Sequence, residues 1–345
     1  MRVMAPPQND PLSGLPTGSR VVVRYRLTSP DAATGAHLSD VVGELLERSD
    51  TAVRVRTRSG VVTLDPRSVT AAKVLPPRAS RRGAPHRALS VEDLERVMVD
   101  AWPATEVAEL GGWRLRAAGG FTMRANSALV LGSPGMPDAA AVAAVGSWYA
   151  ARGLPARLTV PGPAGADPLR DPVAAEVLSR GWSARVETLV MTASTAVAAG
   201  HLDPAARVEV SPTLSPQWFE AFTAYRRADP TYAAAVLTGS PAHAFATVCD
   251  EDDAVVAIGR LGVAHAWGGL GAMWVDPAHR RRGLATQLLA TLAMVAGSAG
   301  ARSLHLQVDA DNAAARAAYA RAGFEVHHGY VTYTGADLPA AEISA

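Results

Sequence analysis

A cluster of arginines and small residues opens an expected helix in the final third of the sequence. Arg280, Gly283 and Ala285 have the spacing R-x-x-G-x-A, and Arg281 and Arg282 fill the gap between the first two. The first amides of a helix lack partners within the helix and carry partial positive charge, so they bind phosphate. Small residues let the backbone approach such an anion closely, and the arginines raise the local potential. The segment therefore predicts a diphosphate site.

A second pair of residues, further along the chain, has the spacing of one helix face. Asn312 stands where a helix N-cap is expected, Tyr319 follows two turns later, and Gly323 ends the helix. A phenol has an ordinary pKa of about 10, so it holds a proton at neutral pH and can give it to a leaving group. Tyr319 is therefore a candidate catalytic acid.

The elements around both segments alternate between strands and helices, which indicates an α/β unit. The arginine-rich turn joins the strand that ends at Val275 to the helix that begins after Gly283. We expect strands at 243–250, 253–262, 266–275, 303–308 and 324–333, and helices at 215–228, 284–300 and 313–323.

Both segments resemble the acetyl-CoA-binding motif and the following strand and helix of the GNAT N-acetyltransferases. The family patterns V-x-P-x-x-R-x-x-G-x-G/A and N-x-x-A-x-x-x-Y-x-x-x-G-F are both matched in order. The first is matched from Val275 to Ala285, and the second by Asn312, Ala315, Tyr319, Gly323 and Phe324.

The resemblance implies an enzyme that transfers acetyl from acetyl-CoA to a primary amine by direct attack in a ternary complex. The amides of residues 281–286 would hold the pyrophosphate, and Met273 and Val275 would pair with the pantetheine arm. Asn312 would contact the same arm, and Tyr319 would protonate the CoA sulfur. The implied cofactor-binding residues are Met273, Val275, Arg280, Arg281, Arg282, Gly283, Leu284, Ala285, Thr286 and Asn312; no metal is expected.

The earlier part of the chain resembles the degenerate first half of tandem GNAT proteins. It has no R-x-x-G-x-G/A loop, so we do not expect it to bind CoA. Before it, five short β-like runs predict a small SH3-like β-barrel, in which Val53 and Val55 alternate with Arg54, Arg56 and Arg58. A hairpin turn is expected at Ser59-Gly60.

The expected fold class is thus α/β (α+β), a tandem GNAT fold with a degenerate N-terminal half, preceded by a small SH3-like β-barrel. The whole arrangement resembles an actinobacterial group of GNATs, and some of its members are regarded as unusual N-acetylglutamate synthases. That resemblance suggests L-glutamate as acceptor. The expected parts are a disordered leader (1–18), the barrel (19–76), a linker (77–88), the degenerate half (89–204) and the catalytic domain (205–345).

Composition limits the class of protein. The 345 residues carry a net charge of +1 and are 48% hydrophobic, so the chain is no polyelectrolyte and has ample material for buried cores. Its single cysteine, Cys249, excludes an intrachain disulfide and a cysteine-based metal cluster. No signal peptide or membrane span is expected, which makes the cytoplasm the default location.

Several assignments stay open at this stage. The strand before the arginine-rich turn holds no carboxylate, so His265 or a water chain is the alternative general base. Arg116, Arg124 and Asn126 could clamp a substrate carboxylate. Arg226 and Arg227 could border the acceptor.

The function of the whole chain also has rivals. They are a protein or peptide acetyltransferase, and a non-catalytic CoA-sensing or nucleic-acid-binding protein that uses the basic barrel. The sequence is compatible with a homo-oligomer.

Overall fold

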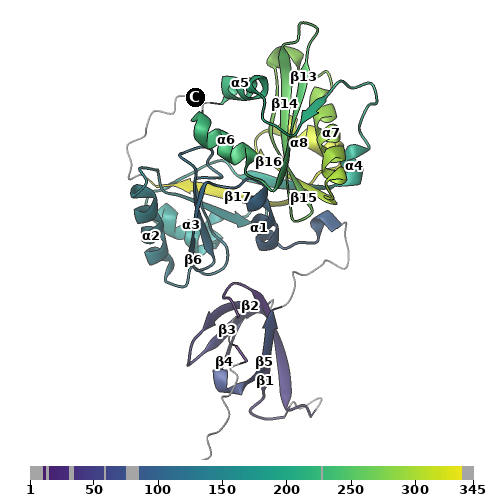
Figure 1. The fold of residues 1–345 in the computed structure, drawn as a ribbon. Helices are drawn as coiled ribbons and strands as arrows, with labels where there is room; N and C mark the ends of the chain where they lie inside the picture. The colour runs from purple at the N-terminus through teal and green to yellow at the C-terminus, as the bar shows by residue number, and fades with distance from the viewer. Residues whose placement is uncertain are drawn as a thin grey trace, which may run out of the picture. The chain divides into compact units, whose positions relative to one another are not determined.

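A computed structural model describes residues 11–12, 15–30, 35–57, 60–74, 85–226 and 228–335. They form two compact units (Figure 1). The smaller unit comprises the described residues up to 77 together with the short segments 109–113 and 131–137, and the larger unit contains the other described residues. The boundaries expected at residues 18, 76, 88 and 204 remain predictions.

The smaller unit contains a five-stranded antiparallel sheet in the order β4-β3-β2-β1-β5. Side chains alternate between its faces, and one face buries Val21, Val23, Leu45, Val53 and Val55. The strands are β1 (Arg20–Arg26), β2 (Leu38–Arg48), β3 (Val53–Thr57), β4 (Gly60–Leu64) and β5 (Val69–Val74).

The arginines of β3 face solvent and are paired across the sheet. Arg54 Nη1 lies 3.4 Å from Glu47 Oε2, and Arg56 Nη1 lies 3.4 Å from Glu44 Oε2. Each such exposed pair is worth about 0–1 kcal/mol, but together they neutralise much of the cationic row. Arg58 and Ser59, the rest of the expected row and turn, lie outside the described residues.

A mixed sheet runs through the larger unit in the order β12-β13-β14-β15-β16-β11-β17-β9-β8-β7-β6, with β10 paired to β17. The strands of its earlier part are β6 (Glu106–Leu110), β7 (Trp113–Ala117), β8 (Ala128–Leu129), β9 (Arg157–Gly162), β10 (Ser183–Ala184) and β11 (Thr188–Ser194). Those of its later part are β12 (Glu209–Ser211), β13 (Ala242–Cys249), β14 (Val255–Ala264), β15 (Trp267–Val275), β16 (Ser303–Asp309) and β17 (Glu325–Thr334).

The two parts of this sheet exchange their last strands. β11 ends the earlier part in sequence, yet it lies between β16 and β17 and is antiparallel to both. β17 ends the chain's later part and pairs with β9 of the earlier part. Because each part contributes a strand to the other, the expected halves 89–204 and 205–345 share one continuous sheet.

Helices cover both faces of the later strands. α7 packs against β13, β14 and β15 with α4 beside it, and α1 packs against β14 and β15 (Figure 1). The helices are α1 (Val91–Ala101), α2 (Asp138–Ala150), α3 (Pro172–Ser179), α4 (Thr195–Ala199), α5 (Pro216–Tyr225), α6 (Pro230–Thr238), α7 (Leu284–Ser298) and α8 (Ala313–Arg321). No helix in the described part of the chain is long and apolar enough to cross a membrane.

The strands and helices expected between residues 215 and 333 are all present, but the structure also contains elements that were not expected. Helices α4 and α6 and strands β6, β10 and β12 were not predicted; α4 lies within residues 194–206, where the small residues indicated a connection. The sequence pattern of residues 111–131 also predicts two strands around Gly119-Gly120. The second of these is reduced to the two residues of β8, and residues 118–127 form a loop. That expectation was wrong because the buried Asn126 side chain bonds the backbone groups that a strand would have used.

Candidate active site

Two neighbouring strands separate at the centre of the large sheet. β15 and β16 are paired in parallel only through Trp267–Ser303, Gly268–Leu304 and Gly269–His305. The next residues of each strand, 270–273 and 306–309, line a cavity of about 370 Å³. The cavity therefore occupies the gap that opens where the parallel pairing stops.

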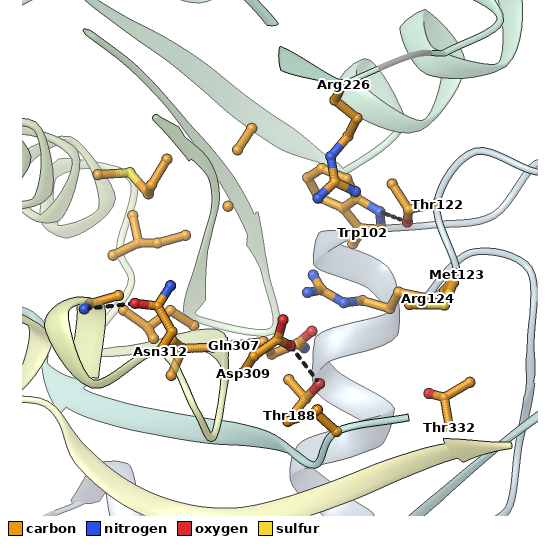
Figure 2. Close-up of a pocket in the computed structure, with 18 of the residues that line it drawn as sticks. Trp102, Thr122, Met123, Arg124, Thr188, Arg226, Gln307, Asp309, Asn312 and Thr332 are labelled. Carbon is orange, nitrogen blue, oxygen red and sulfur yellow. Dashed lines mark hydrogen bonds between the residues drawn. The ribbon is translucent and has the colours of Figure 1, made fainter. Parts of the chain in front are cut away.

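Several further segments close this cavity (Figure 2). The loop after β7 contributes Thr122, Met123 and Arg124, the C-terminal end of α5 contributes Tyr225 and Arg226, and α8 contributes Tyr319. The other lining residues are Trp102, Arg185, Val186, Thr188, Phe222, Leu270, Gly271, Ala272, Met273, Leu306, Gln307, Val308, Asp309, Asn312, Ala315, Tyr330 and Thr332.

A β-bulge shapes the wall that β15 provides. Against β14 the register shifts, so that Ala272 and Met273 oppose the single residue Gly259. Ala272 has a φ of 50°, in the left-handed region. Bulges leave a residue unpaired and redirect the strand, and this one lies where Ala272 and Met273 line the cavity.

The arginine-rich turn leads from β15 into α7 as its residues predicted. Asp276 caps a short 3-10 turn at Pro277–His279, and Arg280 Nε donates to Val275 O at 3.2 Å. Arg281 and Gly283 have φ values of 61° and 80°. Left-handed residues in such a turn aim successive amides toward one side and form a concavity suited to an anion.

The N-terminus of α7 has no side-chain cap. By contrast, α1, α5 and α8 are capped by Ser90, Ser215 and Asn312, each through its side-chain oxygen. A helix end without a cap leaves amide donors for a ligand. Arg281, Arg282 and Gly283 lie beside it and are exposed, so a diphosphate could bind there from the solvent side.

Of the expected cofactor-binding residues, only Met273 and Asn312 line the cavity itself. Asn312 Oδ1 accepts from Ala315 N at 3.1 Å, so Asn312 caps α8 as its position in the sequence predicted. Those outside the cavity lining are Val275 and the turn and first helical residues Arg280, Arg281, Arg282, Gly283, Leu284, Ala285 and Thr286.

Tyr319 lies on α8 at the cavity wall and packs against Phe324, with 6.2 Å between ring centroids. Burial raises the pKa of its hydroxyl above the ordinary value, which keeps the phenol protonated. Its hydroxyl has no hydrogen-bond partner among the residues that the structure describes. Tyr225, whose pKa is also raised mainly by burial, lines the same cavity.

The arginines considered as carboxylate ligands separate into two groups. Arg116 is buried and donates to Ser127 O and Ser127 Oγ at 3.0 Å each, and Asn126 is occupied by loop backbone, so neither reaches the cavity. Arg124 and Arg226 do line it, whereas Arg227 lies outside the described residues. The sequence alone could not show which of Arg116 and Arg124 faces the cavity, because the conformation of the 118–127 loop decides this.

His265 does not lie at the cavity. It occupies the turn between β14 and β15, where its Nε2 is 2.6 Å from Asp100 Oδ2. The carboxylate that does line the cavity is Asp309, whose Oδ1 accepts from Thr188 Oγ1 at 3.2 Å (Figure 2). We did not predict this residue as a base; its place at the end of β16, just before the Asn312 cap, was the available signal.

A family model described as the C-terminal part of the probable histone acetyltransferase Rv0428c matches residues 89–333. The chain belongs to this family. A second model, the Rv0428c N-terminal Sm-like domain, matches residues 15–73. The five-stranded sheet of the smaller unit, expected as an SH3-like barrel, therefore lies in the part of the chain that matches this Sm-like domain.

Individual relatives agree with the family assignment. The probable histone acetyltransferase Rv0428c of Mycobacterium tuberculosis is 38% identical over 145 residues, which span 42% of this chain and 44% of that protein. The uncharacterized N-acetyltransferase YobR of Bacillus subtilis is 28% identical over 243 residues, which span 68% of this chain and 94% of YobR.

A solved structure shares the fold. The GCN5-related N-acetyltransferase from Kribbella flavida has a TM-score of 0.52 at 17% identity, and the match covers 71% of this chain and 95% of that one. The expected α/β (α+β) GNAT fold is therefore confirmed. Residues 89–333 of this chain form a GNAT-type acetyltransferase domain.

Proposed function

We propose that the protein transfers the acetyl group of acetyl-CoA to the primary amine of a small acceptor that also carries an acidic group. The observation that carries this proposal is the cavity between β15 and β16, which adjoins Tyr319. The chain thereby offers a place for a thioester between two separated strands and a phenol at its wall. A cavity of about 370 Å³ is in the size range of small-molecule sites.

The acetyl-CoA fits the residues that are present. The uncapped N-terminus of α7, with Arg281, Arg282 and Gly283 before it, would hold the pyrophosphate. Val275 and Met273 would border the pantetheine arm, and Asn312 would contact the same arm. When bound, acetyl-CoA supplies the activated acetyl group.

The cavity residues can handle the two protons that move when a neutral amine is acetylated, one leaving the nitrogen and one reaching the sulfur. The amine nitrogen attacks the thioester carbonyl carbon, so that a C–N bond forms as the C–S bond breaks. Backbone amides at the Ala272 bulge would stabilise the developing oxyanion. Tyr319 gives its hydroxyl proton to the departing sulfur, and the surplus proton of the amine passes to Asp309, directly or through water.

The charge of the cavity favours an acidic acceptor. Arg124, Arg185 and Arg226 line it, against the single carboxylate of Asp309 in the described part of the chain. A lysine-rich peptide would meet like charge there, which costs affinity. L-Glutamate, an amine with two carboxylates, suits this balance.

A second candidate is protein acetylation, because a relative is named a probable histone acetyltransferase. The cavity arginines count against a basic tail, although an acidic peptide remains compatible with them. A nucleic-acid role of the smaller unit is less favoured, since Glu47 and Glu44 pair with Arg54 and Arg56.

The test is an acceptor screen with the full chain, acetyl-CoA and detection of released thiol. The panel contains L-glutamate and other L-amino acids, a polyamine and a lysine-rich histone-tail peptide. We expect turnover with acidic or zwitterionic amines. Turnover confined to the peptide would establish the second candidate instead, and no thiol release with any acceptor would reject both.

A further inference from the structure

Arg124 reaches the cavity from a loop of the earlier part of the sheet, which itself has no CoA motif. The side chain of Asn126, 0% exposed, holds this loop in one shape. Its Oδ1 accepts from Ala118 N and Gly120 N at 2.8 and 2.9 Å, and its Nδ2 donates to Phe121 O and Thr122 O at 2.8 Å each. Arg124 is therefore carried by a rigid support.

The aromatic ring beside Arg124 adds to that support. Its guanidinium carbon lies 5.5 Å from the centre of the Trp102 ring, and Trp102 Nε1 donates to Thr122 Oγ1 at 3.2 Å. A cation over an indole gains about 0.5–2 kcal/mol. Figure 2 shows the Arg124 side chain directed into the cavity beside Trp102.

The charge of Arg124 is uncompensated within the described residues. Its Nε is buried and has no hydrogen-bond partner, and no carboxylate pairs with its guanidinium. Burial and, second, the charge of Arg124 lower the pKa of the neighbouring Arg260 to about 9. Burying part of a cation without a counter-ion costs free energy. A bound anion would recover that cost, so an unpaired, half-buried arginine is expected where an anionic ligand binds.

Two other cations line the cavity but are less suited to this role. Arg185 and Arg226 are exposed, whereas Arg124 is half-buried. At equal separation, a charge in a less polar environment interacts several-fold more strongly than one in water. Asp309, bonded to Thr188, supplies the opposite sign at the β16 wall.

We propose that Arg124 is the residue that binds the carboxylate of the acceptor, while the acceptor amine lies toward Asp309 and the thioester. The planar guanidinium offers paired donors that match the two oxygens of a carboxylate. This inference rests on the proposed function. It assigns the part of the chain without a CoA motif the task of selecting the acceptor, which makes Arg124 a specificity-determining residue.

The experiment compares acceptors that differ only in the carboxylate. The amino acids that the full chain acetylates are each assayed beside the matching amino acid amide, with wild type, Arg124→Met and Arg124→Lys. For Arg124→Met we expect KM for the free acids to rise roughly 10- to 100-fold, the worth of a charged hydrogen bond. The kcat should change little, the amides should be unaffected, and Arg124→Lys should lie between wild type and Arg124→Met.

Controls separate this inference from folding and from the proposed function. Arg302, exposed and outside the cavity lining, gives the matched variant Arg302→Met, which should behave as wild type. Acetyl-CoA affinity by calorimetry should be the same in all variants. An equal loss for acids and amides in Arg124→Met would overturn the inference and leave the transferase intact. Wild type that acetylates no amine would reject the proposed function, and this inference with it.

Discussion

Gly269 and His305 form the last parallel pair between β15 and β16, and the cavity begins at the next residue of each strand. A Cβ on Gly269 would lie 2.6 Å from His305 Cε1 and 2.8 Å from the Cβ of Ala101 on α1. The close approach of strand, strand and helix at this point thus requires glycine. The two strands begin to separate directly after this contact.

We therefore expect Gly269→Ala to destabilise the protein by about 1–3 kcal/mol, the usual cost of forcing volume into a packed core. Urea unfolding followed by circular dichroism would measure the change. Gly297→Ala is the matched control, because its Cβ would meet only Thr195 Cγ2 at an ordinary 3.4 Å. Alanine is also the better helix former, by about 1 kcal/mol. Equal stabilities of the two variants would contradict the proposed crowding at Gly269.

The turn before α7 gives a prediction about cofactor affinity. Gly283→Glu places a negative charge at the expected pyrophosphate site and should abolish acetyl-CoA binding in calorimetry. The φ of Gly283 is 80°, and nothing lies within 4 Å of an added Cβ, so the backbone strain is only about 1–2 kcal/mol.

A control at the other end of α7 isolates the effect of the charge. Gly300 has a φ of 85° and equally open surroundings, so Gly300→Glu carries the same backbone strain far from the expected pyrophosphate. It should bind acetyl-CoA normally. Retained binding by Gly283→Glu would show that the pyrophosphate lies elsewhere.

The sequence predicted the parts of the site that lie within one turn or one helix. The Arg280 turn and the Asn312 cap follow from local spacing, because a helix start and its capping residue are neighbours in the chain. The β15 strand was also recognisable from its own residues.

Relationships between distant segments could not be predicted in the same way. The exchange of β11 and β17 depends on pairing across more than a hundred residues, which leaves no mark on the local pattern of either strand. Whether Arg116 or Arg124 faces the cavity depends on the Asn126-bonded loop. Asp309 directly follows the strand expected at 303–308, and only the separation of β15 from β16 shows that it borders a cavity.

Removal of the phenol at the cavity wall tests the acid role. Tyr319→Phe keeps the ring against Phe324 and should lower kcat by about 100-fold or more, with acetyl-CoA affinity unchanged. Since burial raises the pKa of Tyr319, the wild-type kcat should fall only above pH of about 10, as the phenol loses its proton. A variant with unchanged kcat across the pH range would remove Tyr319 from this role.

The buried histidine of the last parallel pair should make the fold sensitive to acid. Burial, followed by the charge of Arg124, lowers the pKa of His305 to about 3, against about 6.5 in an unfolded chain. Between these values the unfolded state binds the extra proton, so stability is complete above pH of about 6.5 and falls as the pH decreases. The slope from this residue is about 1.4 kcal/mol per pH unit, or roughly 2 kcal/mol lost by pH 5.

His305→Phe should therefore flatten the dependence of unfolding free energy on pH, as measured in urea between pH 5 and 7.5. The dependence will not vanish, because burial also lowers the pKa of His86 and of His327, which remain in the variant and act in the same direction. The informative quantity is the difference in unfolding free energy between the two proteins at pH 5, minus the same difference at pH 7.5. This subtraction cancels any pH-independent packing cost of the phenyl ring. A difference near zero would mean that His305 takes up its proton in the folded protein as it does in the unfolded chain, and that the junction of β15 and β16 admits water.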